Sequence, residues 1–358
     1  MIERRQERLV ARLGELGLDA MMVSDLVNVR YTTGYVGSNG VAVFGADGRR
    51  QLFTDFRYVV RARAETTGVE VVLAGRDLLD KVAAALGDAA AGGRAGVEAD
   101  HVTLARHRRL TEALPGVELV PVSGVVEDLR VRKEPEEIAR MREAAEVADL
   151  ALDALAAGGL AGRTEREVAW ALEGVMREAG AERVSFDIIV AAGPHGAVPH
   201  HVPDGSPIPA GTLVVVDLGA VVHGYCSDCT RTFATGPLPE ELERAYGVCQ
   251  AAQAEALAAV RPGIVARDLD AVARDHIAAS GLGDAFAHGL GHGVGLEIHE
   301  RPWVRPEGGE TLETGMMVTV EPGIYLEGVG GVRIEDLVAV ADDGPEVLGR
   351  FPKDLVRL

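Results

Sequence analysis

The chain has 358 residues, of which 47% are hydrophobic and 25% are charged, an ordinary composition for a globular protein whose length favours two domains. Lysine and arginine number 36 against 55 aspartates and glutamates, and this net charge of −19 argues against nucleic acid or an anionic membrane as a partner. No stretch approaches the roughly 20 apolar residues that a membrane helix needs.

The first 130 residues predict a small α/β domain. Residues 2–17 carry leucines at helical spacing, which indicates an amphipathic surface helix, and they contain no apolar signal core. Short β-rich runs, such as residues 20–23, then alternate with a helical stretch at residues 78–91. With three cysteines and no export signal, the expected location is the reducing cytoplasm.

The second domain is expected over residues 131–358, where helix pairs alternate with strands. Pro135 suits the first turn of a long helix, and Thr164-Glu165-Arg166-Glu167 is a capping-box pattern that opens the next one. Two more helices are expected at residues 239–260 and 266–280, before the chain returns to strands. Two such halves would pack as a pseudo-symmetric α+β unit.

Four acids in this second domain lie inside or beside apolar, strand-like segments, where an isolated charge is costly to bury. They are Asp217, Asp228, Glu321 and Glu335. Alternation along GVRIED puts Arg333 on the same face as Glu335. Acids that converge on one interior would repel each other and stay protonated unless cations compensate them. Together with His292 in HGLGHGVG, they predict a site for two divalent metals.

The predicted ligand chemistry indicates hydrolysis. Oxygen-rich ligation with one imidazole suits manganese, iron, cobalt or zinc, and it lacks the thiolates of a structural zinc site. Two metals roughly 3.5–4 Å apart can share an oxygen ligand, and a water between them would lose a proton near neutral pH. The resulting hydroxide would be the nucleophile.

Some conspicuous residues have simpler structural explanations. Cys226 and Cys229 spell C-x-x-C, but on a strand they point to opposite faces and are too far apart for a disulfide, so they are expected to be packing residues. Trp170 lies on a predicted helix and is expected in the core. His195 and His201 are expected to be structural or solvent-facing.

The order D-x₁₀-D, GHGVG, EPG and RIED resembles the pita-bread metallopeptidases: methionine aminopeptidase, aminopeptidase P, prolidase and their relative creatinase. YTTGYVGSNG and FTDFRYVVRA look like the N-terminal domain of the aminopeptidase P and prolidase branch. The resemblance implies an α+β protein, in which a creatinase-type α/β domain over residues 1–130 precedes a pseudo-symmetric pita-bread catalytic domain over residues 131–358. It also implies a homodimer, in which the N-terminal domain caps a neighbour's cleft.

The resemblance implies a role for each site residue. Asp228 and Glu335 would bridge both metals, and Asp217 would chelate one of them. His292 and Glu321 would complete the other, and Glu321 would also be the general base. The family also implies further pocket residues, which would bind substrate, stabilise charge on the attacked carbonyl or flank the last ligand. These residues are His200, His288, His299 and Arg333.

The expected activity is hydrolysis of an Xaa-Pro bond at the N-terminus of proline-containing peptides. TGYVGSNG followed by TDFRY favours an aminopeptidase P over the alternative, an Xaa-Pro dipeptidase (prolidase). Two further alternatives are a creatinase-like hydrolase of a non-peptide C–N bond, which works without metals, and a non-catalytic peptide-binding module. The intact ligand types argue against both of them. Manganese is the metal expected first, with cobalt, zinc or iron as alternatives.

Overall fold

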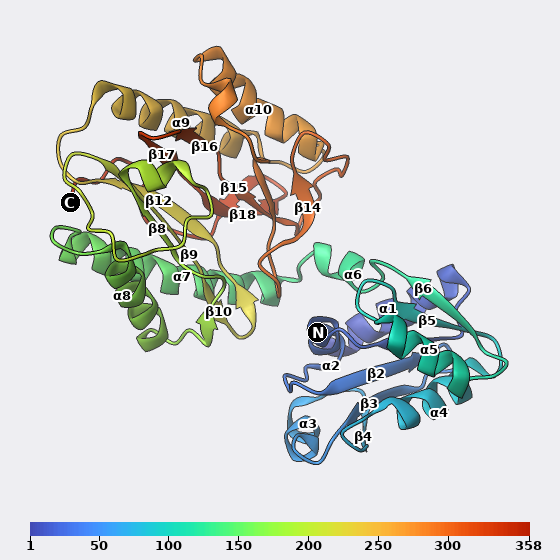
Figure 1. The fold of residues 1–358 in the computed structure, drawn as a ribbon. Helices are drawn as coiled ribbons and strands as arrows, with labels where there is room; N and C mark the ends of the chain where they lie inside the picture. Colours follow the sequence, from blue (N-terminus) through green and yellow to red (C-terminus); the bar gives the residue numbers. More distant parts are fainter. The chain divides into compact units, whose positions relative to one another are not determined.

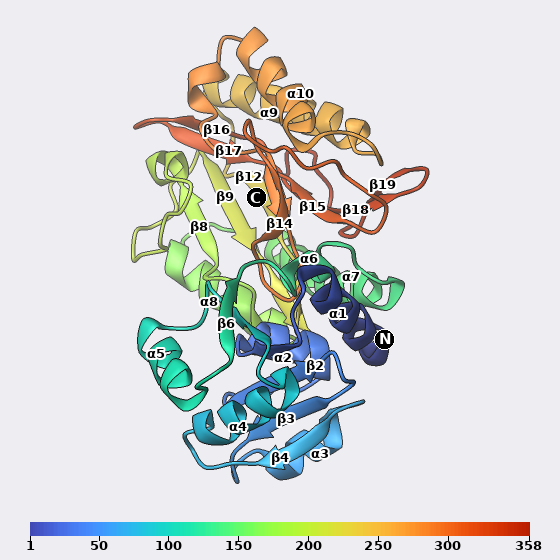
Figure 2. The ribbon, with the colours of Figure 1, turned by 90° about the vertical axis from the view of Figure 1, so that its right-hand side faces the viewer.

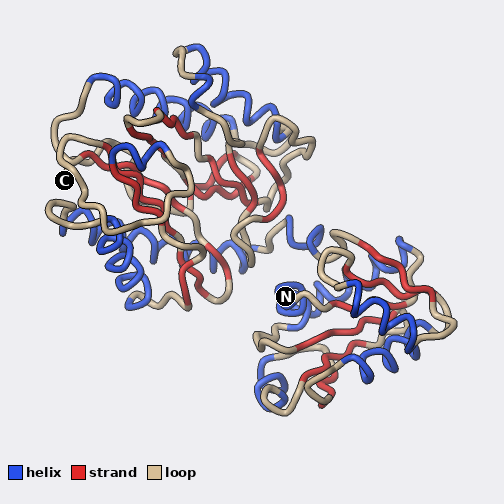
Figure 3. Tube along the Cα trace, in the orientation of Figure 1, coloured by secondary structure: helices blue, strands red, loops and turns tan.

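The computed structural model describes residues 1–358 and divides the chain into two compact units, Met1–Arg130 and Val131–Leu358. Both units combine helices with sheets, which confirms the expected α+β class. Figure 3 shows the strands gathered in the interior of each unit, with helices around them. No helix of the chain is both long enough and apolar enough to cross a bilayer.

The first unit is built on one mixed sheet of six strands in the order β4-β3-β2-β1-β5-β6 (Figure 1). The strands are β1 (Ala20–Val23), β2 (Gly40–Gly45), β3 (Arg50–Thr54), β4 (Glu70–Leu73), β5 (Arg94–Glu98) and β6 (Glu118–Val122). The helices are α1 (Ile2–Leu16), α2 (Leu26–Thr33), α3 (Val59–Glu65), α4 (Leu79–Ala90), α5 (Leu104–Ala113) and α6 (Glu127–Val131). β1 is buried along its whole length because it pairs on both edges and α4 packs against it.

The second unit consists of two halves, each with a helix pair packed on strands. α7 (Pro135–Gly158) and α8 (Glu165–Glu178) share an apolar core with β8 (Ile189–Ala192) and β9 (Leu213–Leu218). The second pair, α9 (Glu240–Ala259) and α10 (Ala266–Ala279), shares another core with strands from the last third of the chain. Figures 1 and 2 show the two helix pairs on opposite sides of these strands.

The remaining elements of this unit are short. In its first half they are β7 (Arg183–Val184), the 3-10 helix η1 (Gly193–Ala197), β10 (Ala220–Val222), β11 (Tyr225–Cys226) and β12 (Cys229–Ala234). In its second half they are η2 (Gly283–Ala285), β13 (Gly291–Gly293), β14 (Glu300–Val304), β15 (Met317–Val320), β16 (Gly323–Leu326), β17 (Gly330–Arg333), β18 (Asp336–Ala341) and β19 (Gly344–Val347).

Helix starts in the second unit follow the predicted capping patterns, but one residue was wrongly predicted to be buried. α7 begins at Pro135, and α8 begins after Thr164, whose hydroxyl accepts a hydrogen bond from the Glu167 amide. Trp170 is 67% exposed instead of lying in the core. The buried side chains of α8 include Val168 and recur at helical spacing. Trp170 lies two positions after Val168, so it points away from the buried side of the helix.

Strand pairing brings the acidic segments of the two halves together. β9 pairs antiparallel with β12, as predicted, and the hairpin of β10 and β11 lies between them in sequence. β15 pairs with β18, β16 with β17, and β13 with β14. β17 packs against both β9 and β12, and β13 packs against β15. The acids at these strands therefore face one interior region of the second unit.

Candidate metal centre

Three of the predicted ligands form a compact acidic cluster. Asp217 lies near the end of β9, Asp228 directly precedes β12, and Glu335 directly precedes β18. All three side chains are buried, and one carboxylate oxygen from each lies within 4.8 Å of the others. The structure therefore brings together acids from three separate strand ends.

Thr230 on β12 links the cluster across the strands. The β9–β12 register places it opposite Asp217. Its hydroxyl lies 2.7 Å from Glu335 Oε2, to which it donates, and its backbone carbonyl accepts from the Glu335 amide at 3.1 Å. The segment between β17 and β18 is thus tied to β12, which fixes where the Glu335 carboxylate points.

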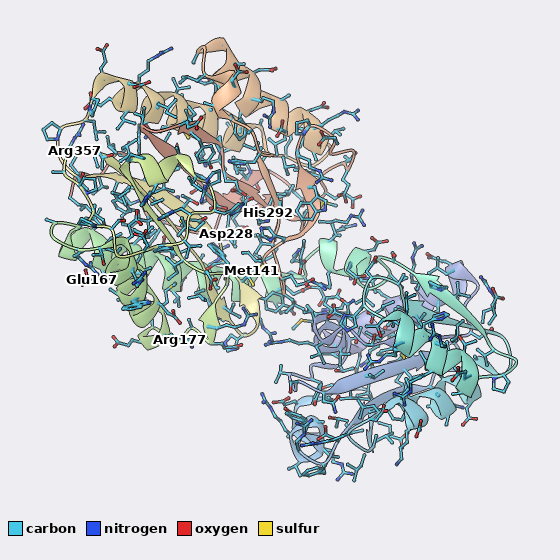
Figure 4. The ribbon with its side chains drawn as sticks, viewed as in Figure 1. Met141, Glu167, Arg177, Asp228, His292 and Arg357 are labelled. Atoms are coloured by element: carbon cyan, nitrogen blue, oxygen red, sulfur yellow. The ribbon has the colours of Figure 1, made fainter.

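His292 and Glu321 complete the group from the second half. His292 Nε2 lies 3.7 Å from Asp228 Oδ2 and 3.3 Å from Glu321 Oε1. Its Nδ1 lies 3.0 Å from the Gly293 carbonyl; a proton on Nδ1 donates there and leaves the Nε2 lone pair directed at the acids. Figure 4 shows Asp228 and His292 next to each other in the interior of this unit.

Thr319, at the third position of β15, aligns these last two side chains. Its hydroxyl oxygen accepts from the His292 amide at 3.0 Å and donates to Glu321 Oε1 at 2.9 Å. β13 has a β-bulge between His292 and Gly293, which turns the His292 side chain away from the direction that regular strand pairing would give it. Glu321 directly follows the buried strand β15, in line with its predicted place beside an apolar strand, whereas the role of Thr319 was not predicted.

The electrostatics of the centre favour added positive charge. Burial, together with the neighbouring carboxylates, raises the pKa of Asp228 and of Glu335 well above the ordinary values. Burial also raises the pKa of Asp217, although Arg333 opposes that shift. Burial would raise the pKa of Glu321 too, but hydrogen bonding and the positive charges near it win, and this pKa is lowered.

The donor set fits a pair of divalent ions. Asp217 Oδ1 and Glu335 Oε1 are fully buried and have no hydrogen-bond partner, which is costly unless a cation accepts their lone pairs. The four carboxylates and Arg333 carry a formal charge of −3, and two divalent ions would bring it to +1. Carboxylates with one imidazole are ligands for manganese, iron, cobalt or zinc.

Arg333 is the buried guanidinium of the centre. Its Nη2 donates to Asp217 Oδ2 at 2.7 Å, its Nη1 to the Tyr325 hydroxyl at 2.8 Å, and its Nε to Thr230 Oγ1 at 3.1 Å. Three donor directions of one planar group are therefore used at once, which a lysine could not reproduce. Tyr325 and Thr230 were not identified from the sequence.

A cavity of about 730 Å³ opens next to the five ligands. The predicted pocket histidines, His200, His288 and His299, all line it. His288 Nε2 lies 2.9 Å from the Tyr325 hydroxyl, and the His299 ring lies 4.4 Å from the His292 ring. Burial lowers the pKa of His288 and of His299 from the ordinary value. His200 is exposed at the edge of this cavity.

A second group of ligand-type side chains, which was not predicted from the sequence, lies beside the cavity. Glu165 is buried at the start of α8, and its two oxygens lie 3.0 Å from His195 Nδ1 and 2.7 Å from His201 Nε2. The two histidine rings stack at 4.2 Å. The sequence pattern indicates only a capping box at Glu165, because nothing local in sequence indicates its partners.

The chain is similar to known peptidases along its whole length. Residues 139–342 match metallopeptidase family M24, and residues 5–132 match the creatinase/prolidase N-terminal domain. An Xaa-Pro dipeptidase from Pyrococcus furiosus is 43% identical over 239 residues, which are 67% of this chain and 69% of that protein.

Solved structures agree with this match. An Xaa-Pro dipeptidase from Bacillus anthracis is 39% identical, with a TM-score of 0.96, and the match covers 100% of both chains. An X-Pro aminopeptidase from Thermotoga maritima MSB8 is 34% identical, with a TM-score of 0.90, and the match covers 97% of this chain and 100% of the other.

Proposed function

The chain belongs to metallopeptidase family M24, and on that premise we propose that it is a two-metal hydrolase that cleaves the Xaa-Pro peptide bond. It joins a creatinase/prolidase N-terminal domain to a pita-bread domain, the organisation that the sequence motifs imply. The observation that carries the proposal is the convergence of the buried acids, two of which have an unpartnered oxygen, beside a cavity lined by histidines.

The proposed ligands are Asp217, Asp228, His292, Glu321 and Glu335. When bound, the ions would polarise the scissile carbonyl and supply a water that is acidic enough to attack it near neutral pH. Glu321 is the proposed general base. Thr319 and His292 both approach its Oε1, which leaves Oε2 to accept a proton.

The other pocket residues have proposed roles in binding and charge stabilisation. His299 and the exposed His200 can donate hydrogen bonds to the carbonyl oxygen as negative charge develops there. His288 is held between the Tyr325 hydroxyl and the Gly289 carbonyl, a contact that supports the wall of the cavity. Arg333 holds Asp217 in the ligand position.

Within this activity, we propose Xaa-Pro dipeptides as the preferred substrates. The sequence motifs favoured an aminopeptidase, whereas the Bacillus anthracis and Pyrococcus furiosus proteins are named as dipeptidases, which supports the alternative better. A dipeptide carries a free carboxylate on proline, which needs a cation. Arg305 lines the cavity and is partly exposed, so it can meet that carboxylate.

Cleavage of longer peptides is the second candidate, because the Thermotoga maritima protein of similar fold is named as an X-Pro aminopeptidase. The deciding experiment compares kcat/KM for Ala-Pro, Ala-Pro amide and Ala-Pro-Ala on metal-loaded protein. A dipeptidase should prefer Ala-Pro at least tenfold, and Arg305→Met should raise KM for Ala-Pro only. Equal turnover of Ala-Pro-Ala would support the aminopeptidase instead.

Manganese is the first metal that we propose, and a homodimer is the proposed assembly. Metal analysis of freshly purified protein should find two divalent ions per chain, and chelation should abolish Xaa-Pro hydrolysis until metal is restored. Full activity of metal-free protein would contradict the two-metal mechanism. A monomeric mass by light scattering at assay concentration would contradict the dimer.

A further inference from the structure

Glu165 is a buried acid that lies outside the five ligands and the residues just described. It is the first residue of α8, where the positive end of the helix favours a negative charge. Its side chain is 1% exposed. Oε1 accepts a hydrogen bond from the Ala192 amide at 2.8 Å and lies 3.0 Å from His195 Nδ1, while Oε2 lies 2.7 Å from His201 Nε2.

These three contacts hold both ends of the segment that carries His200. Ala192 is the last residue of β8, and His201 lies at the far end of the turn that begins with η1. The backbone of α8 adds to this attachment, because the Glu165 amide donates to the Ser206 carbonyl and the Arg166 amide to the Asp204 carbonyl. The His200 segment is therefore tied at both ends to one buried carboxylate, while η1 also packs against β17.

The distances distinguish hydrogen bonding from metal binding at this cluster. A metal with nitrogen and oxygen ligands about 2.0–2.2 Å away in tetrahedral geometry keeps those ligand atoms roughly 3.4 Å apart. His292 Nε2 meets its two acids at 3.3 and 3.7 Å, which leaves such room. Glu165 meets its two histidines at 3.0 and 2.7 Å, the spacing of direct hydrogen bonds.

We propose that Glu165 is a positioning residue that holds His200 at the edge of the substrate cavity, acting through the neighbouring His201. This inference rests on the proposed function, because it assumes that His200 contacts the substrate. An exposed side chain on a turn loses conformational entropy when it is ordered, and the buried carboxylate supplies the bonds that offset this cost. Arg333 contributes a weaker restraint to the same segment through the Pro199 carbonyl at 3.4 Å.

The first test is Glu165→Gln in the metal-loaded enzyme. The amide keeps the size of the side chain but loses the charge, and it cannot accept from both histidines and Ala192 at once. We expect kcat for an Xaa-Pro substrate to fall about 10- to 100-fold, KM to change less than threefold, and two metals per chain to remain bound. Glu167→Gln is the matched control, since it removes an exposed charge from the same helical turn; its kcat should stay within twofold.

A double-mutant cycle tests whether Glu165 acts through His200. In a His200→Ala background, Glu165→Gln should lower kcat by less than threefold, because the group that it positions is already gone. If the fold losses in kcat of the two single variants multiply in the double variant, the proposal is wrong. Should Glu165→Gln fail to fold or to bind metal, His201→Ala takes its place in the same cycle, since it leaves the bond to Ala192 intact.

A readout without catalysis separates this inference from the proposed activity. Hydrogen exchange of the amides over residues 193–203 should be at least tenfold faster in Glu165→Gln than in wild type, and unchanged in Glu167→Gln. Unchanged exchange in Glu165→Gln would refute the positioning role whatever the protein hydrolyses. A third metal per chain that disappears in Glu165→Gln would also refute it, and would show a metal site instead. Absence of Xaa-Pro turnover in wild type, with fast exchange in Glu165→Gln, would refute only the activity.

Discussion

Replacing Arg333 by lysine separates the charge of this residue from its shape. Arg333 donates to Asp217, Tyr325 and Thr230 from three directions, at 2.7, 2.8 and 3.1 Å. A lysine ammonium in the same space can keep the pairing with Asp217, but it cannot span the two hydroxyl groups as well. The net charge of the centre is unchanged, so any effect comes from geometry.

The expected magnitude follows from the lost contacts. Two hydrogen bonds from the charged guanidinium contribute about 1.5–3 kcal/mol each, so about 3–6 kcal/mol is at stake. Since about 1.4 kcal/mol corresponds to a tenfold change, kcat/KM should fall roughly 10²- to 10⁴-fold. Arg333→Met also leaves Asp217 without its buried cationic partner, at a cost of about 3–5 kcal/mol, and should lose metal affinity as well.

The assay is kcat/KM for an Xaa-Pro dipeptide together with the metal content of each variant. Arg130→Lys is the matched control, since Arg130 is equally buried, donates to Asn28 Oδ1 at 2.8 Å and does not line the cavity. It should lower the melting temperature but leave kcat/KM per metal-loaded molecule within twofold. If Arg333→Lys also stays within twofold of wild type, the three-way anchoring argument is refuted.

Three further outcomes are expected. Glu321→Gln should lower kcat by about 10²–10⁴-fold with an unchanged circular dichroism spectrum, and undiminished turnover would defeat the general-base assignment. In metal-free protein, burial raises the pKa values of Asp228 and Glu335, so the folded protein is more stable when both acids are protonated. This contribution to stability is fully present below the ordinary carboxylate pKa near 4, and it is lost as the pH rises through the raised pKa values. The difference in melting temperature between metal-loaded and chelated protein should therefore grow from pH 5 to pH 7, and a constant difference would contradict it. A Cβ at Gly291 would lie 2.1 Å from the Thr319 carbonyl oxygen, so Gly291→Ala should displace β13 and weaken metal binding at least tenfold, as measured by titration with a chelator.

Elements with a strong local pattern were predictable from the sequence, and those held by distant partners were not. α7 and α8 begin where the proline and capping-box signals placed them. α2 was not predicted, because its run of β-branched residues has low helical propensity. It is fixed by Asp25, which caps its first turn, and by Gln6 of α1, whose amide donates to the Thr32 carbonyl.

The same distinction applies to the site. The acids could be found because each follows an apolar strand pattern that makes a buried charge conspicuous. Thr230 and Glu165 could not, because what matters at these positions is the partner, which strand register and helix packing decide. Glu165 meets Ala192, His195 and His201 at separations of 27, 30 and 36 residues. A capping-box position explains its charge but does not indicate these partners.

Alternation along β12 separates the chemistry of the centre from the stability of the fold. Thr230 faces the ligands, where it bonds Glu335 and Arg333. Arg231 and Phe233, at the alternate positions of the strand, point the other way: Arg231 donates to the Phe351 carbonyl, and Phe233 packs against the Phe351 ring at 5.9 Å.

Substitutions on the two faces of β12 should therefore have different effects. Thr230→Val removes two buried bonds to charged groups, each contributing about 1.5–3 kcal/mol, and should lower the melting temperature and also lower kcat/KM at least tenfold. Phe233→Leu should lower the melting temperature and leave kcat/KM within twofold, because its contacts lie in the apolar core under α7 and α8. Kinetics and thermal unfolding of both variants are the measurements. Equal losses of both quantities in both variants would mean that the two faces are coupled, and the separation would fail.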